Sequence, residues 1–307
     1  MALNTYTQVR QAEDVQDEIY MISPADSPIA SLSKTVRATG KLHEWSEDRL
    51  NSSGANRAVE GADAGSDTSQ AITALNNYCQ ILTKVAKITN TMEVVDKYGR
   101  DSEMAYQLEM RYAELSKDIE LAISGQPGGA FQTATAGNAS TARQMAAFQT
   151  QHAGGPNVAT LRLDATSDDT LAKLETRLLD AHQGAHAQGG NPDTLVVTPP
   201  VSRYVASFAA ASGRNRELRD TRTIVNTVDL YVSPFGELNV VQSRELADYE
   251  MLGIDFNHTA TAVLRPTQDF PLAVTGDSIG REIVTEMTFC LLNRDSAFRV
   301  HSISNSL

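Results

Sequence analysis

The most regular pattern of apolar and polar positions in the chain lies at residues 101–124 and predicts a long amphipathic helix. Large apolar side chains recur there at steps of three and four positions, and charged side chains fill the opposite face. Asp101 is a suitable N-cap, and Gly125 followed by Pro127 supplies a stop. At 1.5 Å per residue the helix is roughly 35 Å long, which suits a central element on which strands lie. The apolar stripe comprises Met104, Leu108, Tyr112, Leu115, Ile119 and Ile123.

A second pattern, upstream of this helix, predicts a β-hairpin. Residues 36–48 and 77–92 are both typical of strands. The segment between them, RLNSSGANRAVEGADAGSDTSQ (49–70), has Leu50 and Val59 as its only large apolar side chains. A hairpin over these residues has a tip far longer than the usual two to five residues. Because such a polar tip has little to bury on its own subunit, we expect a partner to order it.

The remaining pattern mixes helices with strands, which indicates the α+β class. Residues 1–35 contain Pro24 and Pro28 and predict an extended arm with a short helix. Further helices are expected at 139–148, at 167–187 and from Pro200 to Gly213. Strands are expected at 194–199, on both sides of the Pro234–Gly236 turn, and at 250–256, 261–265, 279–293 and 297–304.

Composition and charge exclude several classes of protein. A chain of 307 residues with 41% apolar residues is long enough for a sizeable core. No apolar run approaches the ~18 residues of a membrane helix, and the N-terminus lacks the pattern of a signal peptide. The net charge of −12 argues against a conventional nucleic-acid binder, which carries a basic surface. Cys79 and Cys290 lie in apolar strands and are expected to be buried free thiols rather than a disulfide.

One motif matches a catalytic signature. Gly276–Gly280 fits G-x-S-x-G, the turn that presents a nucleophilic serine in hydrolases. That chemistry needs a helix after the serine, whereas the following EIVTEMTFCLL favours a strand. Asp295 and His301 do follow Ser278 in the serine–acid–histidine order of such hydrolases. A simple turn is therefore the preferred interpretation, and a serine hydrolase using Ser278 is the alternative.

Three other patterns fall short of a ligand site. His182 and His186 have the spacing of a metal-binding pair, but no glutamate follows the first histidine, so a solvated helix end is expected. The segment Asp63–Asp67 lacks the alternating ligands of a calcium loop. The glycine-rich residues 125–137 contain no GK[ST]. We therefore expect no catalytic residue, no cofactor and no metal, and the chain is not expected to be an enzyme.

Six segments carry a resemblance to a known family. They cover most of the chain outside the middle lobe, and their order is more specific than any single segment. They are DEIYMISPADSPI (17–29), KLHEWSEDRL (41–50), VEGADA (59–64), YCQILTKVAKITNT (78–91), GRDSEMAYQLEMRYAELSKDIELAI (99–123) and AVLRPTQDFPLAVTGDSIGREIVTEMTFCLLNRDSAF (262–298). In this order they resemble the SU-ten-like major capsid proteins of tailed bacteriophages, which have the Hong Kong 97-type fold.

The resemblance implies an α+β capsid fold of five parts. These are an N-terminal arm at 1–35, an E-loop β-hairpin at 36–92, a peripheral (P) domain at 93–165 with the spine helix 101–124, an inserted axial (A) domain at 166–262, and closing P-domain strands at 263–307.

The resemblance also implies a function. Copies are expected to form pentamers and hexamers of an icosahedral shell around double-stranded phage DNA. The shell is expected to assemble in the host bacterial cytoplasm and to become the virion capsid. Expected partners are other copies, the portal, scaffold or decoration proteins, and DNA faced without specific contacts; no membrane is expected. The residues expected to contact neighbouring subunits are Tyr20, Ile22, Ile29, Leu42, Trp45, Leu50, Val59 and Glu60.

An alternative within shell proteins is a cellular nanocompartment. It has the same fold but encloses a cargo enzyme in place of DNA.

Overall fold

The computed structural model describes nine stretches of the chain, and it combines helices and strands as expected. Tyr20 and Ile22 lie outside the described residues. No helix in the described part of the chain is long and apolar enough to span a membrane. The described residues are 26–51, 53–61, 63, 65, 69–96, 101–125, 131–167, 170–211 and 230–303.

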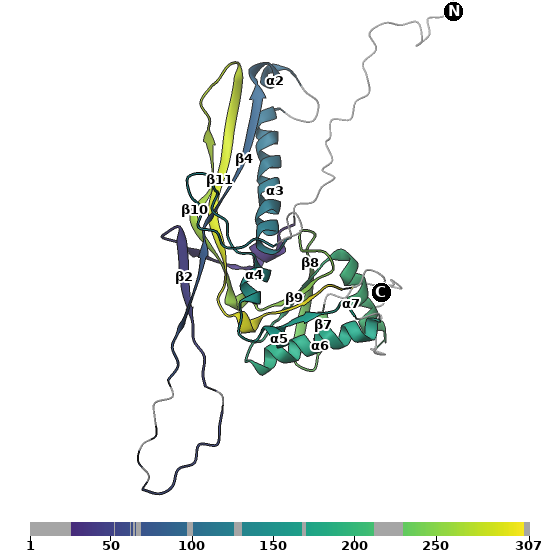
Figure 1. The fold of residues 1–307 in the computed structure, drawn as a ribbon. Helices are drawn as coiled ribbons and strands as arrows, with labels where there is room; N and C mark the ends of the chain where they lie inside the picture. Colours follow the sequence, from purple (N-terminus) through teal and green to yellow (C-terminus); the bar gives the residue numbers. More distant parts are fainter. Residues whose placement is uncertain are drawn as a thin grey trace, which may run out of the picture.

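An elongated spine forms one part of the molecule (Figure 1). Its four-stranded sheet has the order β1-β10-β11-β4, in which β1 is parallel to β10 and the other pairs are antiparallel. The helix α3 packs along β4, and its buried side chains include Leu115 and Ile123 from the predicted stripe. The bounds are β1 (Lys34–Arg37), β4 (Gln80–Thr89), β10 (Thr259–Pro271), β11 (Ser278–Leu291) and α3 (Glu103–Ser124).

The long helix is confirmed, but its cap differs from the predicted one. Ser102, not Asp101, is the N-cap, and its Oγ accepts a hydrogen bond from the backbone N of Ala105 at 3.2 Å. The short helix α2 (Asn90–Val94) completes this end, because the Glu93 carboxylate accepts hydrogen bonds from the first free amides of α3. The cap is therefore shared between a local serine and a carboxylate from the preceding helix.

The predicted hairpin is present, but each of its expected strands is divided between two sheets. The ribbon pairs β2 (Leu42–Glu47) with β3 (Thr73–Tyr78) in antiparallel register. The expected strand 36–48 breaks after Arg37, and the expected strand 77–92 breaks at Cys79. The backbone N of Cys79 donates to Lys41 O at 2.8 Å, at the point where the two sides of the hairpin leave the spine. Alternation of side chains predicts a strand but not its partner, which explains the difference.

A lobe built on a six-stranded sheet forms the other part of the molecule. The strand order is β5-β12-β9-β6-β8-β7, with β7 and β8 forming the predicted hairpin. The bounds are β5 (Arg162–Asp164), β6 (Thr194–Val197), β7 (Leu230–Ser233), β8 (Gly236–Gln242), β9 (Met251–Ile254), β12 (Phe298–His301), α5 (Val158–Leu161), α6 (Leu171–Ala187) and α7 (Pro199–Ala211). Of the two closing strands expected within residues 263–307, β11 lies in the spine sheet and β12 pairs with β5 and β9 of the lobe sheet.

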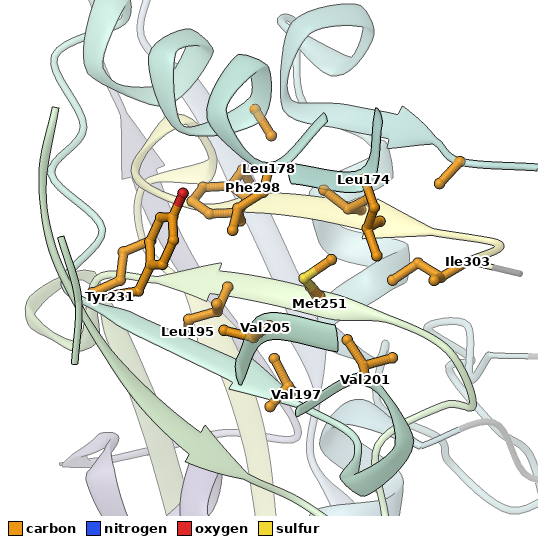
Figure 2. Packing of buried hydrophobic residues seen from close by; sticks show 14 of the residues in the cluster. Leu174, Leu178, Leu195, Val197, Val201, Val205, Tyr231, Met251, Phe298 and Ile303 are labelled. Carbon is orange, nitrogen blue, oxygen red and sulfur yellow. The ribbon is translucent and has the colours of Figure 1, made fainter. Parts of the chain in front are cut away.

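Both faces of the lobe sheet are covered at its centre. Leu195 and Val197 of β6 face a core shared with α6 and α7, which Figure 2 shows around Leu178 and Phe298. Val196 points to the other face and joins a second core. That second core contains residues of α3 and of two short helices, α1 (Pro28–Leu32) and α4 (Phe148–Ala153). The spine and the lobe are therefore packed on a common apolar layer.

The expected helix at 139–148 is wrong, because α4 begins only at Phe148. Backbone hydrogen bonds join Thr135 to Gln144 in both directions, which holds this segment extended. The side chain of Asn77 pairs with Ala146, accepting from its N at 2.8 Å and donating to its O at 3.3 Å. Tertiary partners thus replace the hydrogen bonds that a helix would make.

Candidate assembly surfaces

The hairpin tip presents apolar side chains to solvent. Leu50 is 97% exposed and Val59 is 80% exposed, and Glu60 is also exposed. Every described side chain from Leu50 to Ile72 is exposed. In Figure 1 this segment extends well beyond the rest of the subunit. The three tip residues predicted to contact neighbours are therefore free to do so.

The predicted contact residues at the hairpin base, Leu42 and Trp45, are partly buried on their own subunit, and their contact with neighbours stays a prediction. Trp45 is half-buried, and its Nε1 donates to Leu291 O at 3.2 Å. Leu42 is half-buried in the same ribbon. Trp45 lies on β2, so its hydrogen bond ties the ribbon to the end of β11.

Ile29 is a correction to the predicted set of contacts. It is completely buried in the core that joins the spine and the lobe. The Glu120 carboxylate of α3 accepts hydrogen bonds from the backbone N of Ile29 at 3.1 Å and of Ala30 at 3.0 Å. These amides belong to the first turn of α1, where no helical partner exists. The helix α1 is therefore fixed internally, which removes Ile29 from the surface.

The structure adds a distal apolar surface that the sequence interpretation missed. Val94, the last residue of α2, is 83% exposed, and Val274 is 76% exposed in the turn between β10 and β11. These two elements meet at one end of the spine, since Ser278 pairs with Thr89 (Figure 1). The two adjacent valines at 94 and 95 were the only sequence signal. The surface comprises Met92, Val94, Val95, Phe270, Leu272, Val274 and Ile279.

The catalytic alternative finds no support at Ser278. This residue begins β11, so a strand follows it, and its Oγ donates to Thr275 O at 3.3 Å. Gly276 has φ of +79°, the conformation of a turn glycine. His301 lies on β12 in the lobe sheet, whereas Ser278 lies in the spine sheet. The turn interpretation therefore fits the geometry.

His182 is not part of a solvated helix end, as the sequence suggested. It is buried, its Nδ1 lies 2.9 Å from Ser233 Oγ, and its ring stacks on Phe298. Burial lowers its pKa to about 4. His186, one turn later, is exposed, and no group of three metal-ligating side chains occurs among the described residues. His182 therefore acts as a neutral core side chain.

The two cysteines are buried and free, as predicted. Both belong to a small apolar cluster where the hairpin leaves the spine. Burial raises the pKa of Cys290 to about 12 and also raises the pKa of Cys79. Neither thiol is suited to act as a nucleophile, because the thiolate is the reactive form.

Two buried carboxylates in the described residues, Glu250 and Glu286, form ion pairs with arginines. Arg299 and Glu250 are both almost completely buried and form an ion pair, and the Arg299 guanidinium lies 4.7 Å from the Phe131 ring centroid. Glu286 pairs with Arg143 and, at 2.8 Å, with Arg265 Nε. Desolvation raises the pKa of Glu250, and the Arg299 hydrogen bond opposes that shift. Each carboxylate is matched by a cation, so these groups serve packing rather than proton transfer.

Comparison with known proteins gives consistent matches. Residues 2–304 match the family described as SU10 major capsid protein. A major capsid protein of Escherichia phage Phieco32 is 24% identical over 257 residues, which cover 71% of this chain and 73% of the relative.

Solved structures share the fold at low sequence identity. The capsid structure of Cyanophage P-SCSP1u has a TM-score of 0.61 and 11% identity, with 98% of this chain and 95% of that chain covered. The holo-SrpI encapsulin complex from Synechococcus elongatus PCC 7942 has a TM-score of 0.60 and 7% identity, with 100% and 98% covered. The fold is therefore that of phage capsid proteins, the Hong Kong 97-like fold.

Proposed function

Because the chain belongs to the SU10 major capsid protein family and is a phage major capsid protein, we propose that its copies form pentamers and hexamers of an icosahedral shell around double-stranded DNA. The observation that supports this proposal most directly is the exposed hairpin tip. Leu50 and Val59 are largely exposed in the described part of the chain, and a polar segment with isolated apolar anchors is suited to ordering on a neighbour.

We assign the parts of the subunit to capsid roles in the same proposal. Residues 1–35 are the arm, 36–92 the E-loop and 93–165 the P domain with α3 as its spine helix. Residues 166–262 are the A domain and 263–307 the closing strands, of which β12 returns to the lobe sheet. The lobe sheet supports the A domain, because β6, β7, β8 and β9 all lie within residues 166–262.

The contacts between copies involve two surfaces in this proposal. Leu50, Val59 and Glu60 of the tip contact one neighbour, while Val94 and Val274 of the distal apolar surface contact another. Large apolar side chains that gather at an end of a molecule are typical of protein–protein interfaces. The two surfaces lie at opposite ends of the subunit in Figure 1, which suits a shell subunit that contacts several neighbours.

The charge of the chain supports its proposed relationship to DNA. A net charge of −12 disfavours tight binding to phosphates, so packaged DNA is faced without specific contacts. The shell assembles in the host cytoplasm, and the portal and scaffold or decoration proteins are its other partners. No catalytic role is included, since the geometry at Ser278 is that of a turn.

Removing the tip tests the assembly role. A variant in which residues 51–70 are replaced by a short Gly-Ser turn should keep its folded spine and lobe but lose shell formation. Electron microscopy and size-exclusion chromatography of wild type and variant measure particles, and circular dichroism measures folding. The double variant Leu50→Ser/Val59→Ser keeps the tip length, and Asn56→Ser in the same tip is its matched control. Unchanged shell yield in both tip variants would refute the assembly role.

The nanocompartment alternative rests on the likeness to an encapsulin. The contents of purified particles separate the two functions, because DNA gives a high ratio of absorbance at 260 nm to that at 280 nm and a cargo enzyme does not. The family match favours DNA.

A further inference from the structure

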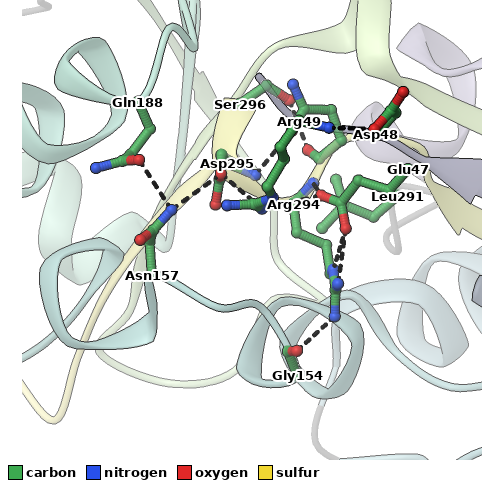
Figure 3. Close-up of polar contacts among 12 residues, drawn as sticks. Glu47, Asp48, Arg49, Gly154, Asn157, Gln188, Leu291, Arg294, Asp295 and Ser296 are labelled. Atoms are coloured by element: carbon green, nitrogen blue, oxygen red, sulfur yellow. Dashed lines mark hydrogen bonds and ion pairs between the residues drawn. The ribbon is translucent and has the colours of Figure 1, made fainter. Parts of the chain in front are cut away.

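The hairpin base is joined to the turn η4 (Arg294–Ser296) by a network of four charged side chains, which Figure 3 shows. Glu47, the last residue of β2, is buried, and its carboxylate accepts from Arg294 Nη2 at 2.6 Å and Nε at 3.1 Å. Arg49 Nη2 lies 2.6 Å from Asp295 Oδ2 and 3.2 Å from Glu47 Oε1. Two acids and two bases therefore alternate around the base of the hairpin.

The same network reaches three helix ends of the lobe. Arg294 Nη1 donates to Gly154 O at the C-terminus of α4. Asn157, the N-cap of α5, donates from Nδ2 to Asp295 Oδ2 and to Gln188 Oε1, each at 3.0 Å. Gln188 is the C-cap residue of α6. The direction of β2 is thus tied to the ends of α4, α5 and α6 through one set of polar contacts.

The network includes η4, and η4 connects the two sheets of the subunit. The turn joins β11, which belongs to the spine sheet, to β12, which belongs to the lobe sheet. Only a few residues separate the two strands, so a change in the angle between the sheets moves Arg294 and Asp295. Past Arg49, every described side chain up to Ile72 is exposed, so Arg49, whose side chain is 32% exposed, is the outermost partly buried residue on this side of the hairpin among the described residues.

We propose that Glu47, Arg49, Arg294 and Asp295 form a hairpin clamp that fixes the direction of the hairpin and couples it to the angle between the spine and lobe sheets. Buried ion pairs suit this task, because their hydrogen bonds are directional and an opened pair leaves an uncompensated charge. The clamp therefore has a closed state and a costly open state. This coupling matters in a shell of the proposed kind. There, a neighbour that binds the hairpin tip changes the angle between the spine and lobe sheets through the clamp.

Variants that open the clamp test this proposal on the full chain kept below its assembly concentration. Glu47→Gln removes the charge at constant shape, and Arg294→Gln removes its main partner. In hydrogen–deuterium exchange, amides of β2 and β3 should exchange roughly tenfold faster or more, since breaking a buried pair costs several kcal/mol. Amides of β6 and β9 should exchange at the wild-type rate.

A distance measurement reports the direction of the hairpin itself. Spin labels on Leu50→Cys, just past the clamp, and on Gln183→Cys, exposed on α6, give a distance distribution by electron paramagnetic resonance. The buried native cysteines remain unlabelled. The distribution should be narrow in the labelled wild type and should broaden or shift when Arg294→Gln or the milder Arg49→Gln is added.

The matched control is Arg281→Gln, which removes the partly exposed ion pair with Asp269 elsewhere on the spine. It should leave both measurements unchanged. An unaltered distance distribution in the clamp variants, or equal acceleration of exchange in β6 and β9, would overturn the proposal. Since both measurements use unassembled subunits, that result would leave the proposed shell function untouched.

Discussion

The Glu120 carboxylate on α3 accepts a hydrogen bond from the backbone N of Ile29 at 3.1 Å, although the two residues are 91 positions apart in the sequence. This contact fixes α1 against α3. It also explains why an acidic residue lies within the largely apolar layer between spine and lobe. The carboxylate is the helix cap that α1 lacks locally, since Ser27 makes no side-chain cap hydrogen bond.

Removing this cap should destabilise the subunit. Glu120→Ala leaves the amides of Ile29 and Ala30 without a partner in a buried site, and the free energy of unfolding should fall by about 2 kcal/mol. Urea unfolding of the unassembled chain measures this change in the free energy of unfolding. Ser116→Ala removes only a partly buried hydroxyl pair with Ser27 and is the matched control, with a loss under about 1 kcal/mol. Equal losses in both variants would contradict the capping role.

Breaking the buried pair of Arg299 and Glu250 should cost more than breaking an exposed pair. Glu250→Ala leaves a guanidinium buried without its counter-ion, and the free energy of unfolding should fall by roughly 3–5 kcal/mol. Asp269→Asn, which removes the partly exposed pair with Arg281, should cost less than about 1 kcal/mol. Chemical denaturation of the two variants makes the comparison. Similar costs would show that the lobe relaxes around Arg299.

Acid should weaken the subunit through His152. Burial, assisted by the nearby arginines, lowers the pKa of His152 to about 4, and its Nε2 lies 3.0 Å from Ala297 O. Between pH 6.5 and 4 the unfolded chain therefore binds a proton that the folded subunit excludes, so stability falls as pH falls. From pH 7 to 5 this loss is about 2 kcal/mol. His152→Gln keeps a donor for Ala297 O and should show a smaller loss in urea unfolding at the two pH values.

The control for this pH effect is His186→Gln at an exposed position of α6. It should retain the wild-type difference between pH 7 and pH 5. If His152→Gln retained the full difference as well, His152 would not contribute to it, and the equally buried His182 would be the residue to substitute next.

The native thiols should be unreactive. Cys79 and Cys290 are buried with raised pKa values, so an aromatic disulfide reagent at pH 8 should label neither thiol in the folded chain. Both should react after denaturation in guanidinium chloride, as absorbance of the released thiolate will show. Rapid labelling of the native subunit would mean that the cluster at the hairpin base opens readily.

Local patterns predicted the elements whose ends are set by local chemistry. The spacing of Leu115 and Ile123, with Gly125 beyond them, is sufficient to place α3 within two residues. The turn at Pro234 likewise separates β7 from β8 as expected. Such features depend on neighbours in sequence, so the sequence alone carries them.

Features that depend on distant partners were not predictable in this way. The segment before Phe148 has good helix formers, yet Asn77 and Thr135 take its backbone hydrogen bonds. Ile29 looked like a free anchor because nothing nearby in sequence identifies Glu120 as its partner. For the candidate surfaces, the tip residues Leu50 and Val59 were identified because their neighbours are polar throughout. The distal surface escaped notice because its two halves lie far apart in the chain.

The place of β12 has a consequence for how the protein is made. Phe298–His301 lies between β5 and β9, so β5 joins the lobe sheet only through this late strand. While the ribosome is still synthesising the chain, the sheet stays open at this position and Phe298 has not yet filled the space beside Leu178. A nascent or truncated chain therefore lacks a finished lobe. Because β12 joins β5 to β9, we expect only chains translated through His301 to fold the complete lobe.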